Sequence, residues 1–125
     1  MARRNRFVSA DTVRLDLSDG DWIEVKAQLT YAETVELQAA GVGDTLKDGD
    51  LKMDWVLYKM ARINTWVIDW SFEDANEKRV PCTPQAVATL DPDTADEIDR
   101  ALDAYLERQA EAKKEKAGAL LPASA

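Results

Sequence analysis

Two short runs near the start of the chain alternate apolar and polar side chains, as strands with one buried face do. The apolar positions are Val13, Leu15 and Leu17 in the first run and Ile23, Val25 and Ala27 in the second. Asp19-Gly20 lies between the runs and favours the tight turns that match strand twist. We therefore predict a β-hairpin over residues 12–27, packed against helices because an isolated hairpin is only marginally stable. In this register Trp22 falls on the face opposite Ile23, and we expect it to be the most exposed tryptophan.

A capping-box pattern follows the hairpin. Thr30 and Glu33 stand where their side chains can satisfy the first backbone N–H groups of a helix. We predict that this helix runs to about Ala40 and ends with Gly41 in the left-handed conformation. Residues 41–50 are polar and rich in glycine and aspartate, so they are predicted to form a flexible loop.

A second helix is predicted from about Asp50 to Asn64. Its apolar residues cover a wide arc, which is typical of a helix that is buried on most sides. They are Met53, Val56, Leu57, Met60, Ala61 and Ile63, with Trp55 and Tyr58 beside them. We therefore expect this helix to be the central and most buried one.

The segment WVIDWSF, residues 66–72, places large apolar side chains at every second position. This alternation and the β-forming composition favour an extended segment from about Trp66 over a continuation of the helix. Large aromatic side chains at such a junction are usually packing residues, so Trp70, with Trp55 or Trp66, is predicted to lie in the core.

Two pairs of a capping residue and a proline mark the starts of further helices. Thr83-Pro84 and Asp91-Pro92 each place proline at the first helical position, where its missing N–H costs nothing. The predicted inward residues are Ala86, Val87 and Leu90 in the first helix, and Ala95, Ile98, Leu102, Tyr105 and Leu106 in the second. The apolar pattern stops at Gln109.

These elements predict one α+β domain, mainly helical, over residues 12–110, in which the N-terminal hairpin packs on a small helical bundle. Residues 1–11 contain several arginines but little periodicity, and we expect a flexible basic arm. Residues 111–125 are small, charged and low in complexity, and we expect a disordered C-terminal tail.

Charge and cysteine content narrow the possible partners. The chain of 125 residues has a formal net charge of −8, which argues against nucleic acid because phosphate neutralisation needs a basic surface. No apolar run approaches the roughly 18 residues of a membrane span. Cys82 is the single cysteine, so an internal disulfide is impossible and a reducing compartment fits best. We expect a soluble intracellular protein.

The residue types that catalysis most often uses are scarce. The chain has no histidine, the commonest general base and metal ligand, and Cys82 therefore has no histidine to activate it. Asp48, Asp50 and Asp54 resemble the start of a calcium loop, but lysine stands at the third ligand position and the required glycine is missing. The acids at Asp91, Asp93 and Asp96 are better explained by a helix N-terminus. We expect no enzyme, no metal site and no cofactor.

The order of motifs along the chain resembles a known protein family. After the hairpin and the T-x-x-E helix start come I-x-x-W-x-x-D-W-S-F at residues 63–72 and V-P-x-T-P-x-A-V-x-x-L-D-P-D-T-A-D-E-I at residues 80–98. A tail rich in glutamate and lysine follows. This order is similar to that of the tail assembly chaperones of long-tailed bacteriophages (siphophages). Residues 63–98, roughly a third of the chain, carry the specific part of the resemblance.

The resemblance implies a function without catalysis. Such chaperones bind the long helical tape measure protein in the host cell cytoplasm, keep it soluble and recruit tail tube protein; they are usually absent from the mature virion. Many relatives also have a minor longer form made by a ribosomal frameshift. A coat of many copies implies a homo-oligomer, which a basic arm and an acidic C-terminal region can support. Equally, both charged regions can serve only to keep a small domain soluble.

Two other classes of function stay open at this point. One is a virion structural protein of the head–tail connector, neck or tail, which would persist in purified particles. The other is a small host-directed binding protein, which a gene neighbourhood without phage tail genes would favour.

We predict a partner-binding surface formed by Trp22 and by Tyr31 and Val35 of the neighbouring helix. Tryptophan and tyrosine are the usual anchors of protein interfaces. The alternative for Trp22 is that it covers an exposed part of the domain's own core.

Overall fold

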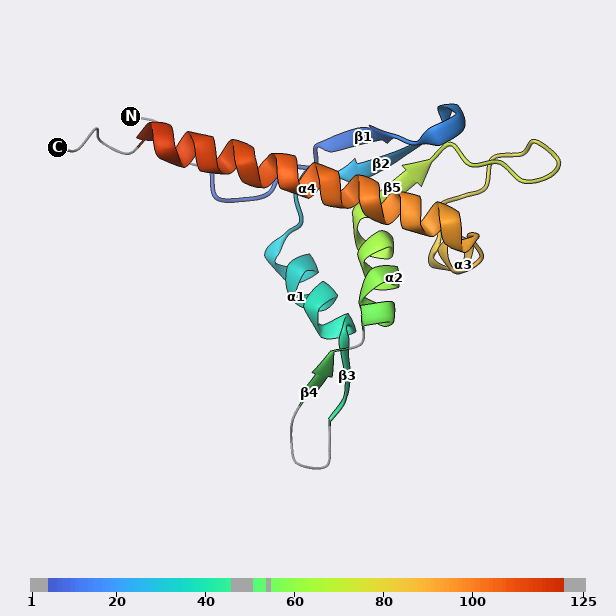
Figure 1. Ribbon diagram of the computed structural model, residues 1–125, viewed down its shortest axis with the longest axis horizontal. Helices are drawn as coiled ribbons and strands as arrows, with labels where there is room; N and C mark the ends of the chain where they lie inside the picture. Colours follow the sequence, from blue (N-terminus) through green and yellow to red (C-terminus); the bar gives the residue numbers. More distant parts are fainter. Residues whose placement is uncertain (1–4, 46–50, 54, 121–125) are drawn as a thin grey trace.

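The computed structural model describes residues 5–45, 51–53 and 55–120 (Figure 1). This part of the chain forms a three-stranded antiparallel sheet, a pair of antiparallel strands and four helices. In chain order the elements are β1 (Thr12–Asp16), β2 (Trp22–Lys26), α1 (Tyr31–Ala40), β3 (Val42–Thr45), β4 (Leu51–Met53), α2 (Trp55–Trp66), β5 (Val67–Trp70), α3 (Pro84–Ala88) and α4 (Pro92–Leu120). The class is mixed α/β with helix predominant, as predicted.

The predicted hairpin is present. Strands β1 and β2 pair antiparallel with Leu15 opposite Ile23. A short 3-10 turn joins them, and it contains Asp19 at φ 59° and Gly20 at φ 78°. These are left-handed values, which glycine adopts freely and aspartate tolerates better than most residues. Leu15, Ile23 and Val25 are buried, so the predicted inward face is confirmed.

A third strand completes the sheet. Strand β5 follows directly after α2 and pairs antiparallel with β2. Ile23 lies opposite Trp70, and the register shifts between Glu24 and Val25. The strand order is therefore β1-β2-β5. The predicted extended segment is confirmed, and it begins at Val67, but its pairing partner was not predicted.

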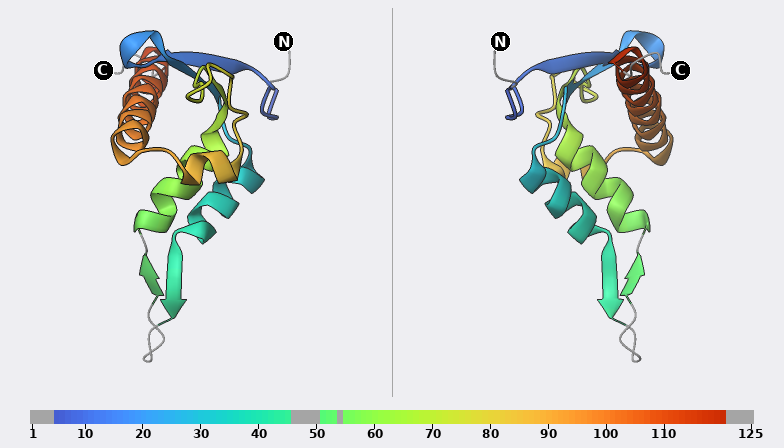
Figure 2. Two further views of the ribbon diagram at one scale, coloured as in Figure 1. Left: turned by 90° about the vertical axis from the view of Figure 1, so that its right-hand side faces the viewer. Right: turned by 90° about the vertical axis from the view of Figure 1, so that its left-hand side faces the viewer.

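Helices α1 and α2 project together from the sheet, and the small β3–β4 hairpin lies beyond them (Figures 1 and 2). The predicted capping box is confirmed: the Thr30 side chain accepts a hydrogen bond from the Glu33 N–H at 3.1 Å, and Glu33 accepts one from the Thr30 N–H at 3.0 Å. The conformation predicted for Gly41 is wrong, because its φ is −85°. The last turn stays right-handed, with the Gly41 N–H bonded to Gln38, and leads straight into β3.

The predicted loop at 41–50 is partly wrong. Residues 42–45 form β3 and pair with β4, whereas residues 46–50 lie outside the described residues. Because residues 51–53 are a strand, the second helix begins at Trp55 and not at Asp50. The acidic cluster that resembled a calcium loop, at positions 48, 50 and 54, also lies outside the described residues.

Helix α2 is buried on fewer sides than the wide apolar arc predicted. Ile63 and Trp66, near its C-terminal end, are buried in the core, and Tyr58 and Ala61 pack against it. Trp55, Leu57 and Met60 are 64%, 46% and 40% exposed. The physical reason is visible in Figure 1: the first turns of α2 lie away from the sheet and have α1 beside them.

Helices α3 and α4 begin at the predicted caps. The Thr83 hydroxyl accepts a hydrogen bond from the Ala86 N–H at 3.1 Å, and the Asp91 carboxylate accepts one from the Thr94 N–H at 2.8 Å. Helix α4 runs along the sheet, and the Ser18 hydroxyl donates a hydrogen bond to Glu97 near its start (Figure 1). Its buried residues are Ile98, Leu102 and Tyr105, as the helical spacing predicted.

The core joins the sheet to α4 and to the ends of α2 and α3. Its buried members are Leu15, Ile23, Val25, Leu37, Ile63, Trp66, Val67, Trp70, Val87, Ile98, Leu102 and Tyr105. The rings of Trp66 and Tyr105 meet edge to face, with centroids 6.3 Å apart. Trp70 and Trp66 are therefore core residues, as predicted.

The two ends of the chain differ from each other. Helix α4 continues to Leu120, whereas the sequence predicted a disordered tail from residue 111. Alanine, glutamate and lysine dominate residues 110–117, and these strong helix formers extend a helix without a buried stripe. Residues 5–11 have no helix or strand, and residues 1–4 and 121–125 lie outside the described residues. The flexibility of the arm and of the last residues stays a prediction.

No helix in the described part is both long and apolar enough to cross a membrane.

Candidate partner-binding site

Trp22 contacts arginine side chains from two other segments. The guanidinium carbon of Arg14, on β1, is 3.8 Å from the ring centroid, and that of Arg79 is 4.9 Å away. Arg79 is itself held by hydrogen bonds to the Trp70 carbonyl at 3.0 Å and to Asp69 at 3.3 Å. These cation–π contacts cover the ring. Trp22 is therefore half-buried, and the prediction that it is the most exposed tryptophan is wrong, because Trp55 is 64% exposed.

Tyr31 and Val35 occupy one face of α1. They are four residues apart, so they are neighbours on the helix surface. Tyr31 is 82% exposed and Val35 is 45% exposed. Most of α1 is exposed in the same way, since Leu37 is its only residue classed as buried.

The structure does not bring Trp22 together with the other two predicted residues. Trp22 is the first residue of β2, and Lys26 is the last, about 13 Å further along the strand. Lys26 forms an ion pair with Glu33 on α1. Helix α1 therefore meets the end of β2 that is remote from Trp22.

The base of α1 is held by this ion pair and by the capping box. The pKa of the Glu33 carboxyl is lowered, first by the hydrogen bond from Lys26 and then by the Thr30 backbone N–H. Leu37 packs into the core one turn further along. These contacts place Tyr31 and Val35 on the projecting part of the molecule.

Helix α2 adds apolar side chains that the sequence interpretation assigned to the core. Together with Tyr31 and Val35, the exposed residues Trp55, Leu57 and Met60 make up what we term the two-helix surface. The Trp55 ring meets Tyr58 edge to face, with centroids 5.7 Å apart. The signal for these residues was present in the sequence as the wide apolar arc, but that arc was interpreted as burial on most sides.

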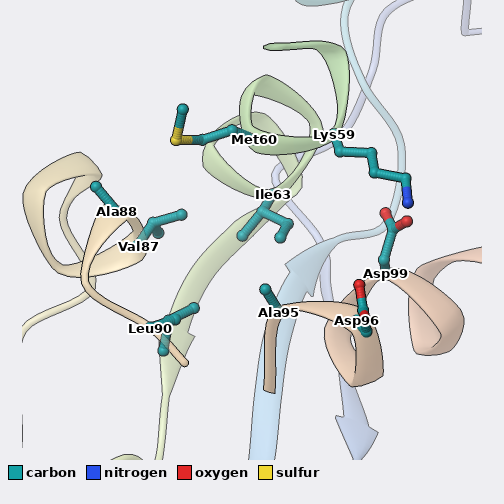
Figure 3. Close-up of a pocket in the computed structure, with 9 residues that line it drawn as sticks. All are labelled: Lys59, Met60, Ile63, Val87, Ala88, Leu90, Ala95, Asp96 and Asp99. Atoms are coloured by element: carbon teal, nitrogen blue, oxygen red, sulfur yellow. The ribbon is translucent and has the colours of Figure 1, made fainter. Parts of the chain in front are cut away.

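A groove of about 240 Å³ lies where α2, α3 and α4 meet (Figure 3). Most of its surface is apolar, and charged side chains stand at its rim. The lining residues are Lys59, Met60, Ile63, Val87, Ala88, Leu90, Ala95, Asp96 and Asp99. Nothing in the sequence pattern indicated this groove, because its walls come from three separate helices.

Cys82 is the natural nucleophile to consider, and its surroundings do not activate it. The thiol is half-buried and lies 3.8 Å from the Val67 carbonyl, to which it can donate. Burial raises the pKa of the Cys82 thiol, and the charge of Asp69 adds to this effect. A raised pKa lowers the fraction of reactive thiolate at neutral pH.

Asp91 caps the start of α4. The pKa of the Asp91 carboxyl is lowered by hydrogen bonds from the Thr94 hydroxyl and backbone N–H. In the described part of the chain, no group of three or more acidic or cysteine side chains is arranged to hold a metal ion. The groove and the two-helix surface are apolar, and apolar surfaces suit the binding of another chain.

Comparison with protein-family models, with curated protein sequences and with solved structures found no significant match for this chain.

Proposed function

We propose that this protein is a non-enzymatic tail assembly chaperone of a long-tailed bacteriophage. In this role it binds the tape measure protein in the host cell cytoplasm, keeps it soluble, promotes assembly of tail tube protein around it, and is absent from the mature virion. The proposal combines the motif order of residues 63–98 with one structural observation, the two-helix surface.

The two-helix surface supports a binding role because exposure of its apolar side chains to water is unfavourable in free energy. Five large apolar residues are exposed on two adjacent helices, at fractions from 40% to 82%. Large exposed aromatic side chains such as Tyr31 and Trp55 are the usual anchors of protein interfaces. A tape measure protein is long and helical, and the apolar stripe of an amphipathic helix is a suitable partner for such a surface.

The position of this surface also suits a reversible chaperone. Helices α1 and α2 project from the sheet and α4, so a client can contact them without disturbing the core (Figure 2). The net charge of −8 favours solubility of the protein and of its complexes with the client. In this proposal the hairpin and helical body are the scaffold, the two-helix surface holds the client, and several copies coat one tape measure protein.

The test is co-expression with the tape measure protein encoded in the same phage genome. Wild type is expected to keep the client in the soluble fraction, whereas the double variant Val35→Glu/Trp55→Glu is expected to leave it insoluble. Both substituted residues are exposed, so the fold should survive, and circular dichroism checks this. Failure of wild type to solubilise the client would refute the proposal.

Trp22→Ala is the matched control for the site. It removes a tryptophan that stacks with two arginines at the far end of β2 from α1, and it should still solubilise the client. Loss of solubilisation in this variant alone would move the client site to the outer face of the sheet. Mass spectrometry of purified particles gives a second check, since stoichiometric amounts there would indicate a connector, neck or tail component instead.

A further inference from the structure

The groove between α2, α3 and α4 has the shape and polarity of a pocket for one large apolar side chain. Val87, Leu90 and Ala95 face its interior, and Ile63 and Met60 close the side formed by α2 (Figure 3). A groove of about 240 Å³ has room for several water molecules. Water molecules in the groove form few hydrogen bonds with its apolar walls, so their replacement by an apolar group is favourable.

The α4 side of this groove is acidic. Asp96 lines the groove, and Asp93 lies one helical turn before it; both are exposed and have no salt bridge with any described residue. Asp99 also lines the groove, but it is paired with Arg62. Lys59 is the single cation among the lining residues. An occupant that carries positive charge beside its apolar group would complement this rim.

The N-terminal arm of the chain has that composition. Arg3, Arg4 and Arg6 precede Phe7 and Val8 in the sequence. Phe7 is 86% exposed, the largest exposed fraction among the large apolar residues that the structure describes. Phe7 is therefore not part of the hydrophobic core of its own copy.

The arm and the groove of one copy lie at opposite ends of the molecule. The arm joins β1 at Asp11, whose carbonyl bonds to the Ala27 N–H, and the Ala27 carbonyl accepts from Tyr105. Tyr105 is ten residues from Ala95 in the groove, about 15 Å along the axis of α4. The Cα of Phe7 can lie at most about 14 Å from that of Asp11, so the arm spans only about that axial distance and must also cross from the sheet to α3. Figure 1 shows the same separation between the N-terminal segment and α3.

We infer that Phe7 of one copy inserts into the groove of a second copy, with Arg6 of its arm facing Asp93 and Asp96. The contact is heterologous because it joins two different surfaces. Such a contact adds copies in a row, which either stays open or closes into a ring. This self-association needs no client and does not depend on the proposed chaperone function.

Sedimentation velocity of the full chain tests the inference. Wild type is expected to form a concentration-dependent series of oligomers that shrinks as salt is added, since the arm–rim attraction is screened. Phe7→Ala should weaken association by about tenfold or more, as loss of an interface anchor does. Tyr31→Ala is the matched control, because it removes another aromatic that is more than 80% exposed and should leave association unchanged.

A second pair of variants tests the groove. Ala88 is exposed and lines the groove, so Ala88→Arg blocks it and repels the basic arm without disturbing the core. Ala104→Arg places the same side chain on an exposed position of α4 outside the groove. Association should be lost in the first variant and kept in the second. Arg6→Glu and Asp96→Lys should each weaken association, and their combination should recover part of it.

The inference is overturned if wild type stays monomeric up to millimolar concentration, or if Phe7→Ala and Ala88→Arg associate like wild type. Client solubilisation is measured separately on the same variants. Phe7→Ala should keep contact with a tape measure protein through the two-helix surface, so failure of self-association and failure of client binding give different results.

Discussion

Arg62 of α2 and Asp99 of α4 form an ion pair in which Nη2 and Oδ1 lie 2.7 Å apart. The same guanidinium donates to the Asp99 carbonyl at 2.8 Å and pairs with Asp103 at 2.8 Å. The Arg62 side chain is only 13% exposed. One residue thus joins the base of the projecting helices to two successive turns of α4.

Removal of Arg62 is expected to cost about 2–3 kcal/mol of unfolding free energy, because it leaves the Asp99 carboxylate partly buried without its partner. Arg62→Met keeps most of the apolar stem, so the loss reports the charge. The measurement is a double-mutant cycle with Asp99→Leu, followed by urea unfolding. The double variant should lose less than the sum of the single variants, and strict additivity would show that the pair is not coupled.

Trp70→Ala is expected to lower the unfolding free energy by about 3–5 kcal/mol, as truncation of a buried aromatic does. Trp70 is 1% exposed, its ring packs against Phe72 with centroids 5.0 Å apart, and its Nε1–H donates to the Val80 carbonyl at 2.7 Å. Trp55→Ala is the matched control and should change the stability by less than about 1 kcal/mol. Equal losses in the two variants would contradict the assignment of Trp70 to the core.

Glu33→Gln should destabilise the protein at neutral pH but not in acid. The folded pKa of Glu33 is lowered, so its ionised form adds stability that is complete above the unfolded pKa and is lost as the pH falls through the folded pKa. Gln still accepts from the Thr30 N–H, so the capping box is kept and about 0.5–1 kcal/mol from the Lys26 pair is removed. Urea unfolding between about pH 7 and pH 3 checks this. A difference between wild type and variant that is independent of pH would contradict it.

Helix α4 should exchange its amide hydrogens at two very different rates. The segment that carries Ile98, Leu102 and Tyr105 is buried against the sheet and is expected to be protected, whereas residues 111–115 are exposed and should exchange rapidly. A helix without tertiary contacts is only marginally stable in water. Hydrogen–deuterium exchange resolves the two segments, and a chain that ends at Ala110 should unfold at nearly the wild-type temperature. Strong protection of residues 111–115 in the monomer would indicate a contact that the fold does not show.

Local features of the fold were predictable from the sequence. The caps at Thr30, Thr83 and Asp91 are present as predicted, because a cap is a bond between a side chain and a backbone N–H three residues away. The hairpin register and the spacing of buried residues on α4 also follow from local periodicity. None of these features depends on what packs beside the element.

Features that depend on distant segments were not predictable. The outward direction of Trp22 was correct, but its exposure was not, because Arg79 comes from a turn 57 residues further along the chain. Likewise the wide apolar arc of α2 fits burial and a binding surface equally well. Only the position of the helix relative to the sheet distinguishes them, and in this fold the first turns of α2 extend past the layer that could cover them.

The sequence by itself determined where most elements begin and which face of each is apolar, since both depend on neighbours within a turn or a strand. The tertiary structure alone decided that β5 joins β2, that Tyr31 and Val35 share a projecting pair of helices with Trp55 while Trp22 does not, and that three helices enclose a groove. Contacts across many residues are selected by the packing of the whole chain, and no local pattern encodes which apolar face is left uncovered.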